Sequence, residues 1–292
     1  MSEARLVADA VDRRGGCGVM NRDDHIPARI IQTGPSRDLP LLRRAVVANI
    51  RLLNPEFEYC FFDDDDVERF VDAEFPEYRR MFDTFRFRIQ KYDFFRYLAV
   101  YRFGGFYLDL DLLLGAGLAP LTGHQCVFSF EDLHISGFLR RRYGMDWTIA
   151  NYAFGARAGQ PFLRKVIHNC VRAHEDPAWV EPALHGIPRL LRDDFVVLCT
   201  TGPLLLSRTL AENPELAADM TILFPDDVRC RETWHKFGHI GVHLMEGSWR
   251  KRDTLGRRRL RLMWEWWMFR KCLRESGRLG AVRRVVRAPV SV

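Results

Sequence analysis

Short apolar runs alternate with amphipathic segments along the first two thirds of this chain. The apolar runs 29–32, 59–62, 126–130 and 196–199 predict strands, and the segments 39–53, 67–75 and 162–173 predict helices. Strands that alternate with helices in this order predict an α/β fold with a mostly parallel central sheet. The pattern contains no internal repeat and no low-complexity segment.

The acidic run 63–66 lies between the second predicted strand and the next helix. Acids at the end of a strand and in the first turn of a helix commonly cap that helix and interact favourably with its dipole. We therefore interpret the run as capping residues, and a metal site is the alternative that stays open.

The segment 91–114 carries the clearest chemical signal. An amphipathic helix over 91–103 ends at Gly104 and Gly105, and an apolar strand that contains Asp109 and Asp111 follows at once. Residues two apart on a strand project from the same face, so we expect both carboxylates on one side. Two like charges on an apolar strand are costly unless a cation neutralises them, and their hard oxygens suit Mg²⁺ or Mn²⁺.

Two charged residues of the preceding helix add to this array. Asp93 and Arg96 are three residues apart and share one helical face, which the two glycines can turn toward the strand. Carboxylates beside a bidentate guanidinium suit a ligand that contains a diphosphate and a ribose. The alternative is that Asp109 and Asp111 cap the strand end and pair with surface arginines.

The pattern Asp93-x-x-Arg96, followed by Gly104-Gly105-x-Tyr107-x-Asp109-x-Asp111, resembles the sugar-binding DXD region of glycosyltransferase family 32. That family and its relatives include yeast initiating mannosyltransferases, bacterial capsule and lipopolysaccharide transferases and, more distantly, clostridial glucosylating toxins. The resemblance extends to the segments 26–33, 54–59, 201–203 and 243–249, and so covers roughly residues 25–250. Departures stand at Ile31, where the family usually has His, and at Gly34, where it usually has Trp.

The resemblance implies a GT-A-type, Rossmann-like nucleotide-sugar-binding domain, whose ligand lies at the carboxyl ends of the strands. We expect a flexible N-terminal segment over 1–24, the GT-A domain over 25–250, and a basic, Trp-rich helical tail over 251–292.

The resemblance also implies roles for individual residues. Asp111 would bind the metal directly, Asp109 would bridge ribose and metal, and Arg96 with Asp93 would orient the hydroxyls of the donor sugar. His243 would face the metal or the diphosphate. The remaining candidates for donor or acceptor binding are Tyr107, Asn151, Ser248 and Trp249.

The implied activity is transfer of a sugar from a UDP- or GDP-linked donor to a glycan or lipid-linked acceptor, with Mn²⁺ or Mg²⁺ as cofactor. Family members of this kind retain the anomeric configuration, and a front-face path needs no protein nucleophile, so no catalytic base is assigned. We favour a role in surface polysaccharide synthesis, and a toxin-like transferase that modifies a host protein is the alternative. The sequence does not identify the donor, the acceptor, the linkage or the oligomeric state.

Two alternative functions account for fewer of these sequence features. A strand that ends in Asp-x-Asp also opens the haloacid-dehalogenase phosphatases. Those enzymes place the motif near the chain start, with Thr or Val two residues after the second acid, where this chain has Leu113. A non-enzymatic membrane-docking module would make no use of the acid–arginine array.

Charge is concentrated at the C-terminal end. From residue 250 onward there are fourteen Lys and Arg and three acids, a balance of +11, so the net charge of +6 leaves −5 for residues 1–249. Three of the seven tryptophans lie at 264–267, in an apolar stretch of about ten residues that is too short to span a bilayer. Residues 257–287 therefore either contact an anionic membrane surface or form a helix that docks its aromatic side on the domain. We expect no nucleic-acid partner, because the basic residues follow no known binding module.

The rest of the composition fits a globular enzyme. A chain of 292 residues with 47% hydrophobic content can bury one large core. Seven scattered cysteines form no Cys-x-x-Cys pair, and residues 1–21 lack the apolar stretch of a signal peptide. We expect a cytoplasmic protein, attached to the inner face of the membrane if the tail binds lipid.

Overall fold

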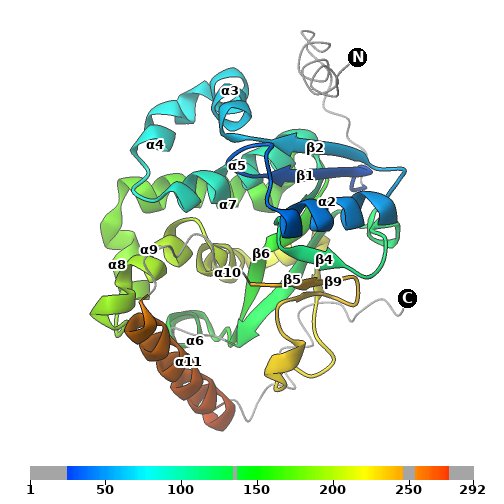
Figure 1. The fold of residues 1–292 in the computed structure, drawn as a ribbon. Helices are drawn as coiled ribbons and strands as arrows, with labels where there is room; N and C mark the ends of the chain where they lie inside the picture. The colour runs from blue at the N-terminus through cyan, green and yellow to red at the C-terminus, as the bar shows by residue number, and fades with distance from the viewer. Residues whose placement is uncertain (1–24, 134–136, 246–253, 276–292) are drawn as a thin grey trace.

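The computed structural model describes residues 25–133, 137–245 and 254–275, and the segment expected to be flexible, 1–24, lies outside them. Within these residues nine strands form two sheets (Figure 1). The strands are β1 (Arg29–Thr33), β2 (Glu58–Phe62), β3 (Gly105–Leu108), β4 (Leu112–Leu114), β5 (Cys126–Leu133), β6 (Trp147–Ala156), β7 (Thr221–Leu223), β8 (Lys236–Phe237) and β9 (Gly241–His243).

The larger sheet has the order β2-β1-β3-β6-β5-β7, and the smaller has the order β4-β9-β8. In the larger sheet β6 runs antiparallel to both of its neighbours, β3 and β5, and the other pairings are parallel. The predicted α/β class with a mostly parallel central sheet is therefore confirmed.

Helices cover both faces of the larger sheet. The described α-helices are α2 (Leu41–Leu53), α3 (Asp64–Glu74), α4 (Arg79–Thr84), α5 (Arg88–Phe103), α6 (Phe138–Tyr143), α7 (Pro161–Glu175), α8 (Pro177–Leu184), α9 (Arg192–Thr200), α10 (Pro203–Glu212) and α11 (Leu255–Glu275). Short 3₁₀ turns lie at Pro76–Tyr78, Ala119–Leu121, Arg189–Leu191, Pro214–Asp219 and Arg231–Thr233.

The core lies on the two faces of this sheet because side chains alternate along each strand. On β1, Ile31 packs among the residues of α5, α7 and α10, whereas Ile30 packs on the side of α2. Tyr107 and Phe106 divide in the same way on β3. Both faces of the central strands are therefore buried, which explains their continuous apolar runs.

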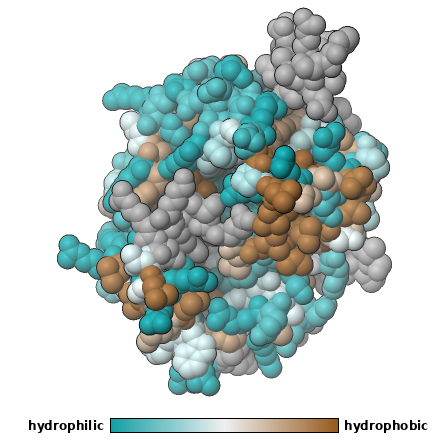
Figure 2. All heavy atoms as spheres, viewed as in Figure 1, coloured by the Kyte–Doolittle hydropathy of each residue, from teal (hydrophilic) through white to brown (hydrophobic). Residues whose placement is uncertain are grey.

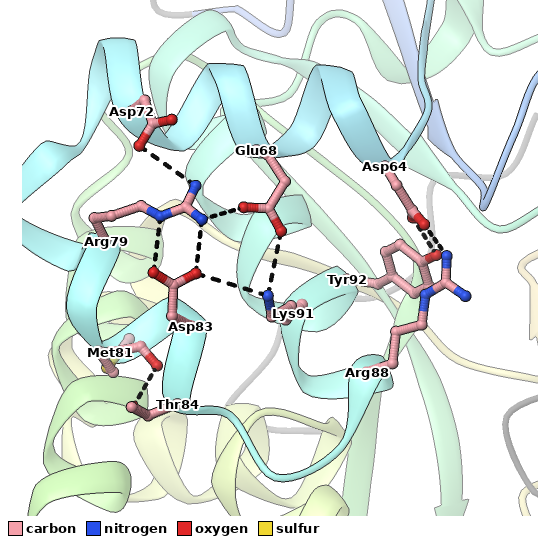
Figure 3. Close-up of polar contacts among 10 residues, drawn as sticks. All are labelled: Asp64, Glu68, Asp72, Arg79, Met81, Asp83, Thr84, Arg88, Lys91 and Tyr92. Carbon is pink, nitrogen blue, oxygen red and sulfur yellow. Dashed lines mark hydrogen bonds and ion pairs between the residues drawn. The ribbon is translucent and has the colours of Figure 1, made fainter.

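The acidic run 63–66 caps α3, as predicted. The Asp63 side chain accepts a hydrogen bond from the Asp66 backbone N–H at 2.9 Å, and the Asp66 side chain accepts one from the Asp63 N–H at 3.2 Å. Asp64 pairs with Arg88 and accepts a hydrogen bond from the Tyr92 hydroxyl at 2.6 Å (Figure 3). The run thus joins the start of α3 to the start of α5.

A group of surface charges ties α3, α4 and α5 together (Figure 3). Arg79 lies within 3.3 Å of Glu68, Asp72 and Asp83, and Lys91 lies 3.2 Å from Glu68. Each exposed pair stabilises the fold only weakly, and the group connects α4 with α3 and with the first turn of α5.

The junction between α5 and β3 depends on two glycines. Gly104 ends the helix with φ = 66°, and Gly105 starts the strand with φ = 110°. A Cβ at Gly105 would lie 2.7 Å from the carbonyl oxygen of Arg29 on the neighbouring strand. Glycine is therefore required both by backbone conformation and by the close approach of β1.

Two predicted strands are corrected by the structure. Residues 196–199 belong to helix α9, since a short buried β-branched run has no period that separates strand from helix. The apolar strand through Asp109 and Asp111 is interrupted. β3 ends at Leu108, a turn follows in which the Leu112 N–H donates to the Asp109 carbonyl at 3.1 Å, and β4 belongs to the other sheet.

The C-terminal tail contains a 21-residue helix, α11, and residues 276–292 lie outside the described part. Trp264 packs edge-on against Phe195 and Phe269 against Trp234, with ring centroids 5.2 and 5.3 Å apart. Among the described helices none alone is long and apolar enough to span a bilayer. Taken together, the segments 189–200 and 203–212 are long and apolar enough to span a bilayer, by length and composition only, and they are bent by 50° to one another.

We expect Gly105→Ala to destabilise the fold by about 1–3 kcal/mol, because the added methyl meets the Arg29 carbonyl and the backbone conformation is unfavourable for alanine. Urea unfolding followed by circular dichroism measures the change. Gly123→Ala is the matched control, since a Cβ there meets nothing within 4 Å. Equal urea midpoints for both variants would contradict the proposed constraint.

Candidate active site

A cavity of about 840 Å³ lies where β1 and β3 end and where α5, β6 and β9 meet. Its lining includes nearly every described residue that the sequence had singled out: Asp93, Arg96, Tyr107, Asp109, Asp111, Asn151 and His243. Ser248 and Trp249 lie outside the described residues. The position at the carboxyl ends of parallel strands is the usual ligand site of open α/β sheets.

The turn that carries Asp109 and Asp111 joins the two sheets. The Asp109 N–H donates to the Tyr152 carbonyl on β6 at 2.7 Å, and the Asp111 carbonyl accepts from the Leu244 N–H at 2.8 Å. Leu112 then pairs with His243 in the β4–β9 ladder. These backbone bonds bring His243, distant in sequence, next to Asp111.

Asp109, Asp111 and His243 form a cluster that can hold a metal ion. One side-chain ligand atom from each residue lies within 4.8 Å of the other two, and His243 Nε2 is 3.2 Å from Asp111 Oδ1. His243 Nδ1 is buried without a hydrogen-bond partner among the described residues, and its ring stacks on Tyr152 at 4.2 Å. Two hard carboxylates and one imidazole fit Mn²⁺ or Mg²⁺.

The electrostatics of this cluster are compatible with a bound cation. Burial raises the pKa of Asp109, and the nearby Asp111 raises it further, against the opposing effect of Arg96. Burial lowers the pKa of His243, but the hydrogen bond and charge of Asp111 outweigh burial, so the net pKa is raised. A divalent ion between these groups favours the ionised carboxylates and the neutral imidazole.

Arg96 lies almost fully buried between the helix and the turn. Its guanidinium is 3.2 Å from Asp93 Oδ1 and 3.4 Å from Asp109 Oδ1, and Nη1 donates to the Asn151 carbonyl at 2.7 Å. It also lies 4.6 Å from the centre of the Tyr107 ring. The structure therefore shows Arg96 oriented by protein acceptors and holding Asp109 in place.

Asp93 is held by three donors. Thr201 donates to Oδ2 at 2.9 Å, and Asn151 Nδ2 donates to Oδ1 at 3.0 Å, the same oxygen that faces Arg96. Burial raises the pKa of Asp93 to about 7, opposed by Arg96 and these hydrogen bonds. Asp93 and Arg96 thus share a helical face, as the three-residue spacing predicted.

Tyr107 and Asn151 act on other site residues in this structure. The Tyr107 hydroxyl donates to Asp109 Oδ1 at 2.9 Å, and its ring is buried. Asn151 lies within strand β6, and its Nδ2 donates to Asp93 Oδ1 at 3.0 Å. Both residues line the cavity and orient the acids beside them.

Sequence analysis missed a second polar group on the cavity wall. Glu131 lines the cavity, and its Oε1 lies 3.6 Å from His235 Nδ1. Burial lowers the pKa of His235, but Glu131 outweighs it and raises the net pKa. Glu131 directly follows the predicted strand 126–130, so its place at a strand end was the available signal.

Asp132, the neighbour of Glu131, points away from solvent. It is 4% exposed and accepts a hydrogen bond from the Thr148 hydroxyl at 2.5 Å. Burial raises the pKa of Asp132 to about 8, and the charge of Glu131 adds to this. This raised pKa favours the protonated form of Asp132 in the folded protein.

Comparison with known families identifies part of this site. Residues 43–128 match the family model described as "Glycosyltransferase sugar-binding region containing DXD motif". That range includes Asp93, Arg96, Asp109 and Asp111, and it ends within β5.

Similar curated proteins are named as sugar transferases. Inositol phosphoceramide mannosyltransferase 3 of Schizosaccharomyces pombe is 28% identical over 235 residues, which cover 80% of this chain and 58% of that protein. Mannosyl phosphorylinositol ceramide synthase SUR1 of Saccharomyces cerevisiae is 26% identical over 62% of this chain and 41% of its own length. This chain thus spans about half the length of the curated relatives it matches.

Two solved structures that share part of this fold are named as a glycosyltransferase and a xylosyltransferase. The PaToxG glycosyltransferase superimposes with a TM-score of 0.44 at 15% identity, covering 65% of this chain and 70% of that one. Mouse xyloside xylosyltransferase 1 gives a TM-score of 0.38 at 15% identity, covering 67% of this chain and 84% of that one.

We expect the stability of the wild-type protein to fall as pH rises from about 4 to 8, in part because Asp132 has a raised folded pKa. In this window the folded chain keeps a proton that the unfolded chain releases, so ionisation favours unfolding. Asp132→Asn removes this term and keeps the hydrogen-bonding shape. Melting temperatures at pH 5 to 8 should therefore decline less steeply for the variant. Parallel curves for the two proteins would show that Asp132 is ionised when folded.

Proposed function

We propose that this chain is a DXD-type glycosyltransferase similar to family 32, and that it transfers a hexose from a UDP- or GDP-linked donor to a lipid-linked acceptor. The observation that carries the proposal is the convergence of Asp109, Asp111 and His243 with Arg96 on one cavity. Such a site binds a nucleoside diphosphate through a divalent cation.

The side chains of the site have different roles in donor binding. Asp109, Asp111 and His243 would hold the cation, which would supply Lewis-acid stabilisation of the diphosphate. Arg96 is a positioning residue, since it holds the carboxylates of Asp93 and Asp109 in fixed orientations. Tyr107 supports Asp109 from the other side through its hydroxyl.

The reaction path that we propose needs no protein nucleophile, so we assign none among the described lining residues. We propose transfer with retention of configuration along a front-face path, in which the departing phosphate accepts the proton of the acceptor hydroxyl. Glu131 lies on the same cavity and can orient that hydroxyl as a hydrogen-bond acceptor.

The names of the relatives support the choice of substrates. The yeast proteins are described as transferring mannose to inositol phosphoceramide, so mannose and a lipid-borne acceptor are our first candidates. A role in cell-surface polysaccharide or glycolipid synthesis at the inner face of the membrane follows as part of the proposal. A toxin-like transferase that modifies a host protein stays the alternative.

We expect Asp111→Asn to abolish transfer while leaving circular dichroism unchanged, because the variant loses a charged metal ligand and keeps its shape. The measurement is release of nucleoside diphosphate from UDP- and GDP-hexoses with Mn²⁺. Asp72→Asn, at a surface acid of α3 that contacts Arg79, is the matched control. Wild-type turnover by Asp111→Asn at saturating donor and Mn²⁺ would show that the metal site is elsewhere.

We expect Arg96→Lys to lower donor use by roughly tenfold or more, on the scale of one or two charged hydrogen bonds of about 1.5–3 kcal/mol. Because Arg96 positions Asp109, the Mn²⁺ concentration for half-maximal activity should rise as well. Arg69→Lys, at an exposed arginine paired with Asp66, is the control. An unchanged Mn²⁺ requirement beside a lower rate would rule out the positioning role.

A further inference from the structure

Helix α11 has two different faces. One face packs on the domain through Trp264, Met268 and Phe269. The same face carries Arg257 and Arg261, which lie 2.8 and 3.6 Å from the two carboxylate oxygens of Asp194 on α9. These contacts confirm that the helix docks on the domain, which was one of the two alternatives predicted from the sequence.

The other face of α11 remains in solvent and is both apolar and basic. Its exposed large apolar residues are Leu255, Leu262, Met263, Trp266 and Trp267, between 50% and 70% exposed. Its exposed cations are Arg258, Arg259, Arg270 and Arg274. Among the described side chains of the helix the one acid, Glu265, is half-buried and faces Arg261 at 3.9 Å. We call this outward side the α11 face.

Cations accompany the exposed indoles on this face. Arg270 lies 4.4 Å from the centre of the Trp266 ring, and Lys271 lies 5.5 Å from that of Trp267. An exposed tryptophan with a cation over its ring combines a large apolar body with a positive charge. That combination suits the interface of a bilayer, where rings bury and cations meet anionic headgroups.

A second exposed apolar patch lies over the smaller sheet and α2. Leu113 and Val242 are cross-strand partners on β4 and β9, 44% and 46% exposed, and Leu244 follows at 40%. Leu41 and Leu42, at the start of α2, are 75% and 52% exposed. Figure 2 shows hydrophobic residues gathered over α2, β4 and β9, and we call these four leucines and one valine the β4–β9 patch.

The active-site cavity is bordered by both surfaces. Arg43, in the first turn of α2, lines it beside the β4–β9 patch, as does Met245 just after β9. Arg257, in the first turn of α11, lines it beside the α11 face. Residues next to each of the two exposed apolar surfaces thus line the cavity.

We propose that the α11 face and the β4–β9 patch lie on an anionic lipid bilayer, so that the cavity receives its acceptor from the membrane surface. The proposal rests on the proposed transferase function and specifies where that site works. Charge selects the occupant, because the α11 face has several cations and no exposed acid among its described side chains. A second copy of the chain would bring like charges together at this face.

The test is co-sedimentation with vesicles of phosphatidylcholine that contain about one quarter phosphatidylserine, compared with pure phosphatidylcholine. We expect the full chain to bind the anionic vesicles and to release them when salt rises from about 0.05 to 0.5 M. Arg258→Gln with Arg259→Gln should weaken binding by at least tenfold, at about fivefold for each removed cation. Trp266→Ser with Trp267→Ser should weaken it comparably and leave the salt dependence unchanged.

A matched control replaces two basic residues outside both surfaces, Arg164→Gln with Lys165→Gln on α7, and should bind like the wild type. Removal of the whole tail is a poor test, because it would uncover Phe195 and Trp234. Equal binding of the tryptophan variant and the wild type would overturn the proposal, as would equal loss of binding in the α7 control. Salt-sensitive binding to DNA that survives the tryptophan changes would replace the membrane with a general polyanion. Light scattering that shows a dimer broken by the tryptophan changes would replace it with a second copy.

Donor hydrolysis separates this proposal from the transferase function. The tryptophan variant should hydrolyse a nucleotide sugar at the wild-type rate in solution and lose transfer to a vesicle-borne acceptor. A wild-type protein that binds vesicles but hydrolyses no nucleotide sugar would contradict the proposed function alone. One that hydrolyses donor but ignores anionic vesicles would contradict the membrane surface alone.

Discussion

The buried guanidinium of Arg96 is the interaction on which the rest of the site depends. It contacts a carboxylate from its own helix, Asp93, and one from the turn after β3, Asp109, together with the carbonyl of Asn151 on β6. A permanent positive charge in this position lets two acids stay close in a site sheltered from water. Asp111 adds a third carboxylate, so the array still favours an additional cation beside it.

The same turn joins the two sheets, and this explains how a metal site arises from distant parts of the chain. The Asp109 N–H donates to β6, and the Asp111 carbonyl accepts from Leu244 just after β9, so the turn is fixed at both ends. The position of His243 next to Asp111 is then set by the pairing of β9 with β4. Each candidate ligand is thus placed by backbone bonding, which is more rigid than side-chain packing alone.

Much of this arrangement could be predicted from sequence because it is local. The helix before Gly104, the strand after Gly105 and the spacing of Asp93 and Arg96 all depend on neighbouring residues. Contacts made across the fold could not be predicted from spacing. Glu131 reaches the cavity because β5 pairs with β6. Residues 196–199 form a helix, although a short apolar run of this kind is equally compatible with a strand. His243 could be assigned to the site only through the resemblance to a known family, because it is distant in sequence from Asp109 and Asp111.

Asp194 shows that two properties of the molecule cannot vary independently. Its carboxylate forms part of the cavity wall and also receives Arg257 and Arg261 from α11. A substitution that reshapes this wall for a different acceptor would also loosen the helix, and a change in the helix would disturb the wall. Evolution of acceptor choice in such a chain must therefore alter both segments together, or replace this carboxylate with a side chain that still holds the two arginines.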